Sequence, residues 1–119
     1  MEEAALRVVV PVYVFTVPED VEANGVSSVG LRELTAQDEL MCAKRAGGDS
    51  IRLAFEMAKQ ALAEVNEKKV SLVDGSADKA WDSFSSQIRQ LVLTAYAEIH
   101  NVDEAKTKNF LKSRQVKVG

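Results

Sequence analysis

The chain has 119 residues, of which 46% are hydrophobic and 28% are charged, and its formal net charge is −3. This length predicts one domain with a single core, and this composition argues against global disorder. One cysteine (Cys42) and one histidine (His100) exclude an internal disulfide framework and disfavour a zinc site or a Cys–His nucleophile pair. No apolar run approaches the roughly 20 residues that span a bilayer, and the acidic start MEEAAL is unlike an export signal. We therefore expect no membrane association and a cytoplasmic location.

The segment RVVVPVYVFTV, residues 7–17, has the strongest β-strand pattern, because it is rich in β-branched and aromatic residues. Its two alternating sides are both apolar, and they consist of Val8, Val10, Val12 and Val14 and of Val9, Tyr13 and Phe15. We therefore expect both faces to be covered, by this domain or by a partner. Pro11 has no N–H to donate and favours an edge or a bulge. Two interpretations stay open: the strand lies inside its own core, or it is an exposed edge that adds to another subunit's sheet.

The whole pattern predicts a single α+β domain over residues 1–119. An N-terminal β-hairpin (residues 7–34) packs on a three- to four-helix body (residues 35–113), and residues 114–119 form an extended arm. The loop of the hairpin carries Asn24-Gly25, a pair that suits a turn with positive φ. Thr35 and Asp38 can form a capping box that starts the first helix, and Gly47-Gly48 can end it.

Three further helices are expected after this stop. The second starts at Asp49 or Ser50, and its apolar stripe continues to Val65. A polar turn at 66–69 and a short extended piece, VSLV, then lead to an amphipathic helix over residues 77–100, in which Ser85-Ser86 is a candidate site for a kink. Asn101 and Glu104 predict a capping box for a last helix over about 102–113.

None of the polar clusters predicts catalysis, a cofactor or a bound metal ion. The sequence GGDS at 47–50 lacks the Gly-Lys-Ser/Thr ending of a phosphate-binding loop. The acids at 74, 78 and 82 suit a helix start better than a calcium loop, which needs a bidentate acid at its twelfth position. His100 is expected to cap a helix C-terminus, and Cys42 to fill a buried space. We therefore expect a protein that is not an enzyme.

Charge and aromatic residues indicate where a protein partner could bind. Residues 1–41 hold two basic and eight acidic side chains, a net −6, whereas residues 101–119 hold five basic and two acidic ones, a net +3. The basic tail could bind an acidic partner or its own N-terminal half, but it is too short and too poor in aromatic residues to indicate nucleic-acid binding. Trp81 and Phe84 fall on the core stripe, whereas Tyr96 lies beside it and is the better candidate for a partly exposed contact.

Residues 26–115 resemble the tail assembly chaperones of long-tailed phages and prophages. A β-hairpin leads into LRELTAQDEL, and after EVNEKKVSL a W-x-x-F helix carries IRQLVLTAYAEIHN before the end, NFLKSRQVKVG. The resemblance rests on the following residues: Leu31, Arg32, Glu33, Thr35, Asp38, Glu39, Arg89, Leu91, Ala95, Tyr96, Asn101, Phe110, Leu111 and Ser113.

The resemblance implies a non-enzymatic protein that coats the tape measure protein and helps tail tube subunits assemble around it, in the cytoplasm of the bacterial host. The N-terminal strand is longer and more apolar than this role requires, so the alternative is a structural subunit of a tail, baseplate or related contractile particle that self-associates through this strand and forms a homo-oligomer. In either case we expect the protein-interaction residues to be Val8, Val10, Val12, Tyr13, Val14, Phe15, Tyr96, Phe110, Lys112 and Arg114.

Overall fold

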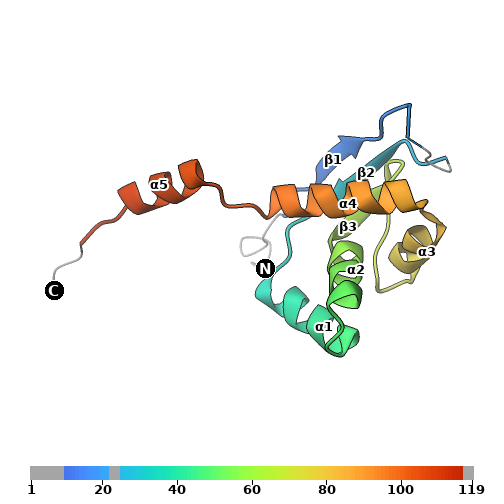
Figure 1. Ribbon diagram of the computed structural model, residues 1–119, viewed down its shortest axis with the longest axis horizontal. Coiled ribbons are helices and arrows are strands. Elements are labelled where there is room, and N and C mark those ends of the chain that lie inside the picture. Colours follow the sequence, from blue (N-terminus) through green and yellow to red (C-terminus); the bar gives the residue numbers. More distant parts are fainter. Residues whose placement is uncertain (1–9, 22–24, 117–119) are drawn as a thin grey trace, which may run out of the picture.

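The computed structural model describes residues 10–21 and 25–116, which form the α+β fold shown in Figure 1. The strands are β1 (Tyr13–Thr16), β2 (Ser28–Leu31), β3 (Leu62–Val65) and β4 (Lys68–Lys69). The helices are α1 (Ala36–Ala46), α2 (Ser50–Ala61), α3 (Ser76–Ser83), α4 (Ser86–Ile99) and α5 (Glu104–Lys112). The predicted fold class, with an N-terminal hairpin against helices, is confirmed.

The strands form one antiparallel sheet in the order β1-β2-β3-β4. β1 and β2 make the expected hairpin, in which Tyr13 pairs with Leu31 and Thr16 with Ser28. The predicted strand over residues 7–17 is too long: residues 7–9 lie outside the described part of the chain, and regular pairing begins only at Tyr13. Pro11, which cannot donate to a ladder, lies just before this start.

Local capping signals place the helix starts of α1 and α2 where the sequence predicts them. Thr35 and Asp38 form a complete capping box at the start of α1. Gly47 ends this helix in the left-handed conformation, with φ of 60°. The Asp49 side chain then accepts from the backbone N–H groups of Ile51 and Arg52 and starts α2.

The predicted end of the second helix is wrong. α2 stops at Ala61, and Leu62–Val65 form β3, in which Leu62 pairs with Leu31 and Val65 with Val29. The apolar spacing fits a helix as far as Val65, but pairing with β2 outweighs it. A turn through Asn66 and Glu67, both with positive φ, then leads into β4. The prediction of a short extended piece at VSLV, residues 70–73, is also wrong, because these residues belong to no strand.

The expected helix over residues 77–100 is two helices, separated by two extended residues, Phe84 and Ser85. Phe84 has ψ of 141°, and Ser85 starts α4 by accepting from the N–H of Ile88. The N-cap of α5 is Asp103, which accepts from the N–H of Lys106, so the predicted capping box at Asn101 and Glu104 is wrong.

The core lies between the sheet and the helices. α4 crosses one face of the sheet, α3 contacts β3, and α1 packs against α2 (Figure 1). The buried residues of this core are Val29, Leu31, Ala58, Ala61, Leu62, Trp81, Phe84, Ile88, Val92 and Ala95. Trp81 and Phe84 are therefore core residues, as predicted.

Helix α5 projects away from this body, roughly in the direction in which α4 ends (Figure 1). The radius of gyration is 17.1 Å, whereas a compact chain of this length has roughly 13–14 Å. Within residues 10–21 and 25–116, no helix has both the length and the apolar character that crossing a bilayer requires.

Candidate protein-interaction surface

Strand β1 is an edge strand, and it leaves large apolar side chains in contact with solvent. Only one of its sides is paired within the described residues, by β2. Val10, Val12, Tyr13 and Val14 are all exposed. Val8, the remaining predicted contact on this side of the strand, lies outside the described residues. The interpretation that the strand is sandwiched in its own core therefore does not hold for residues 10–14.

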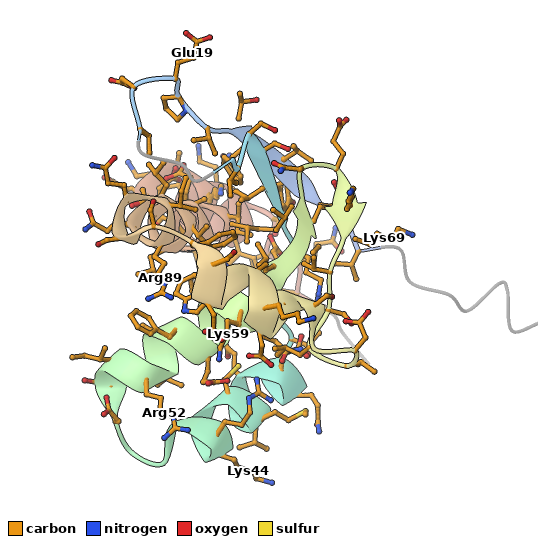
Figure 2. All side chains as sticks on the ribbon, turned by 90° about the vertical axis from the view of Figure 1, so that its right-hand side faces the viewer. Glu19, Lys44, Arg52, Lys59, Lys69 and Arg89 are labelled. Atoms are coloured by element: carbon orange, nitrogen blue, oxygen red, sulfur yellow. The ribbon has the colours of Figure 1, made fainter. Side chains whose placement is uncertain are left out.

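The two faces of β1 have different environments. Phe15 points to the core face, where it pairs with the buried Val29 and is partly buried itself. Val12 and Val14, 39% and 57% exposed, belong to the opposite set. Figure 2 shows the helices on one side of the sheet, so the described helices leave this outer face open. Within the described residues the domain thus covers only the face of Phe15, and cover of the outer face by a partner stays a prediction.

A glycine in the neighbouring strand lets the chain before β1 approach the outer face closely. A Cβ atom at Gly30 would lie 2.9 Å from Cγ1 of Val12 and 3.1 Å from Cβ of Glu64. These distances are shorter than ordinary contacts, so Val12 fills the space that a side chain at position 30 would need. Val12 and Val14 therefore form a small apolar surface beside the free edge.

An apolar groove of about 310 Å³ lies between β1 and α4. Its lining residues are Phe15, Thr16, Val17, Pro18, Val29, Leu91, Thr94, Ala95 and Glu98. Among these, only Glu98 carries a charge. The sequence predicted Phe15 as a contact but did not predict the α4 side of the groove. Leu91 and Ala95 fall on the apolar stripe of their helix, which made them look like core residues.

Tyr96 lies away from this groove, on the side of α4 that meets α2. Its hydroxyl donates to Sδ of Met57 over 3.4 Å, and its ring stacks on His100 with centroids 4.2 Å apart. Burial raises the pKa of this phenol above its usual value. The structure therefore does not bring Tyr96 together with the β1 residues in one surface.

Helix α5 is a second, separate apolar and basic surface. Phe110 and Leu111 are 74% and 63% exposed, and Lys112 and Arg114 are also exposed. Within the described chain, no residue of α5 is buried. The nine predicted interaction residues that the structure describes thus occupy three places: β1 and the residues just before it, the inner side of α4, and α5 with the residues just after it.

Three acidic side chains near the helix starts, those of Asp74, Asp78 and Asp38, have structural partners. Asp74 accepts from the backbone N–H of Ser76 over 2.9 Å, and Asp78 pairs with Lys59 over 3.0 Å. Asp38 pairs with Arg32 over 3.2 Å besides completing the capping box. Among the residues that the structure describes, no group of three or more His, Cys, Asp and Glu side chains is arranged to hold a metal ion.

A partly buried ion-pair network joins α1, α2 and α3. Glu56, only 8% exposed, accepts from Nε of Arg45 over 2.8 Å and pairs with Lys59 over 3.1 Å. Arg45 also donates to Gln60 over 3.0 Å. The sequence places Glu56 on the polar face of its helix, so its burial was not predicted. Since its polar atoms are paired, we regard this network as structural.

Comparisons with known proteins do not add to this picture: no family model, no curated protein and no solved structure matches the chain.

Proposed function

We propose that this chain is a non-enzymatic phage tail assembly chaperone that binds tape measure protein and tail tube subunits in the cytoplasm of the bacterial host. The observation that carries the proposal is the open edge of β1, whose outer face presents Val12 and Val14 to solvent. A chaperone of this kind needs an apolar surface that engages its client reversibly. The resemblance of residues 26–115 to tail assembly chaperones supplies the identity of the client.

Strand addition is the binding mode that this edge favours. An extended client segment would pair with the free backbone groups of β1 and lay alternate side chains on Val12 and Val14. β1 has four residues, so the added ladder has only a few hydrogen bonds, each worth about 1 kcal/mol net. Binding of this strength is readily reversed, as is required of a protein that releases its client.

The test is co-expression with the tape measure protein encoded in the same genome. A lysine at an outer-face edge position opposes strand addition because it would place a charge under the client's apolar side chains. We expect Val14→Lys to abolish co-purification and to leave the client insoluble. Ile51→Lys is the matched control, since Ile51 is 69% exposed on α2, at the end of that helix farther from the sheet. Retention of client binding by Val14→Lys would refute the proposed site.

The second candidate is a structural subunit of a tail, baseplate or related contractile particle. The same open edge favours it, because neighbouring subunits can fill such edges permanently and form a homo-oligomer. The two roles differ in the fate of the protein. A chaperone is absent from purified mature particles, whereas a structural subunit is present in them in fixed proportion to the tube protein.

A further inference from the structure

Helix α5 makes too few contacts to be stable as it stands. It has nine residues, and isolated helices shorter than about 12–15 residues are marginal in water. Its Asp103 cap and the ion pair between Glu104 and Lys108 each add only a fraction of the missing stability. Packing of an apolar face normally supplies the rest. Since the described body does not cover Phe110 and Leu111, this helix requires a docking surface elsewhere.

The groove between β1 and α4 is the complementary feature. It is open, about 310 Å³ in volume, and lined almost entirely by apolar groups such as Phe15 and Leu91. The exposed large apolar side chains of α5 are Phe110 and Leu111, which follow one another near the end of the helix. An aromatic side chain that enters such a pocket is a typical anchor.

The charges of the two surfaces are complementary. Glu98 lines the groove, and the exposed Glu19 and Asp20 follow its Pro18 along the chain. The arm presents the opposite sign, and its exposed basic residues are Lys106, Lys108, Lys112 and Arg114. This arrangement favours one orientation, in which the basic end of α5 lies beside the acidic rim of the groove.

The path of the chain directs the arm away from its own groove. α5 leaves the body beyond the end of α4 (Figure 1). The junction is fixed by the His100 ring, which accepts from the backbone N–H of Leu34, and by Nζ of Lys106, which donates to the carbonyl oxygen of Asn101. To reach its own groove, α5 would have to reverse direction over Asn101–Asp103.

We propose that α5 of each copy docks in the β1–α4 groove of a second copy, with Phe110 as its anchor. Reciprocal docking uses the same two surfaces twice and closes a two-fold symmetric dimer. It also covers two apolar surfaces that residues 10–21 and 25–116 of a single copy leave open. This inference does not depend on the proposed chaperone function, because it concerns the core side of β1 and not the free edge or the outer face.

The first experiment is light scattering of the full chain over a wide range of concentration. We expect a mass twice the 13.0 kDa of one chain at high concentration. Phe110→Asp, in the arm, and Thr94→Arg, in the groove, should each raise the dissociation constant of the dimer about tenfold or more. Both residues are exposed, so neither variant should unfold the body. The matched controls are Asn109→Asp on α5 and Gln90→Arg on α4, which should dimerise like the unaltered chain.

The second experiment mixes the two variants. Phe110→Asp has an intact groove and Thr94→Arg has an intact arm, so the mixture should form a dimer held by one arm, although each variant alone is monomeric. A chain that stays monomeric at all concentrations would overturn the proposal and indicate that the arm folds back. A dimer that both variants leave unchanged, or a mixture without complementation, would also overturn it.

Discussion

Nε2 of His100 accepts a hydrogen bond from the backbone N–H of Leu34 over 2.9 Å, and Nδ1 lies 2.8 Å from the carbonyl oxygen of Tyr96. Because the N–H can only donate and the carbonyl can only accept, the ring carries its proton on Nδ1. His100 is also the C-cap of α4. The only histidine of the chain therefore joins the end of α4 to the connection between β2 and α1.

Replacing this ring should weaken the fold without affecting any chemistry. His100→Ala leaves the partly buried N–H of Leu34 without its acceptor, so we expect the free energy of unfolding to fall by about 1–2 kcal/mol. Asn101→Ala, at the next and exposed position, should change it by less than about 0.5 kcal/mol. Urea denaturation of both variants measures the difference. Equal stability of His100→Ala and the unaltered chain would contradict the role of this bond.

The Glu56 network predicts a specific response to acid. Burial raises the pKa of this carboxyl, but hydrogen bonds from Arg45 and Lys59 lower it more, so the net pKa lies below its usual value. The unfolded chain then binds more protons than the folded one at acidic pH. The stabilisation is therefore complete above the unfolded pKa of about 4.3 and is lost as the pH falls through the folded value.

Glu56→Gln should remove this part of the pH dependence. At pH 7 we expect a loss of about 2 kcal/mol, because Arg45 and Lys59 lose their shared carboxylate in a partly buried place. In acid the difference from the unaltered chain should shrink toward zero. Denaturation curves at neutral pH and at several acidic pH values test both statements. A difference that stays constant as the pH falls would show that Glu56 does not titrate as argued.

Gly30 should be coupled energetically to Val12. In Gly30→Ala the new Cβ meets Cγ1 of Val12 at 2.9 Å, so we expect a loss of about 1–2 kcal/mol. Val12→Ala removes this colliding atom, so the double variant should regain the part of the loss that is due to Val12, whereas the 3.1 Å approach to Cβ of Glu64 remains. A double-mutant cycle on unfolding free energies measures the coupling. Additive effects would mean that Val12 does not lie over Gly30.

Local signals in the sequence were sufficient where neighbouring residues decide the structure. Thr35, Gly47 and Asp49 act on backbone groups within a few positions, and the helix ends they predict are confirmed. The spacing of apolar residues predicted the wrong element where pairing with a strand far away in the sequence decides the structure. Leu62–Val65 fit a helical stripe, but pairing with β2 makes them a strand.

The candidate interaction surface was likewise predicted only as far as local residues decide it. The apolar pattern of residues 7–17 identified a strand with two apolar sides, but it left open whether this strand lies in the core or at an edge, and which side the domain covers. That answer depends on α4, which lies about 80 residues later and covers only the side of Phe15. The burial of Glu56 was missed for a related reason: its partners come from α1 and from its own helix, and sequence spacing does not show that α1 folds back onto α2.

Cys42 should be protected from thiol reagents in the folded protein. Its side chain is fully buried on α1, and burial raises the pKa of its thiol even though Arg45 partly opposes this effect. Few thiolates are therefore present, and none is accessible. We expect labelling by a chromogenic disulfide reagent only as fast as the protein unfolds, whereas denatured chain reacts at once. Rapid labelling under native conditions would mean that α1 opens independently of the body.

The body should fold without the arm. α5 and the residues after it are exposed throughout the described chain, and the core residues all lie before position 96. A chain ending at Asn101 keeps the His100 bond to Leu34, so its thermal midpoint in dilute solution should match that of the full chain. Phe84→Ala provides the contrast, because loss of this buried ring should cost about 3–5 kcal/mol. Circular dichroism during heating measures all three proteins. A large fall in the midpoint of the shortened chain would show that α5 supports the body, and would place its docking site within the same copy.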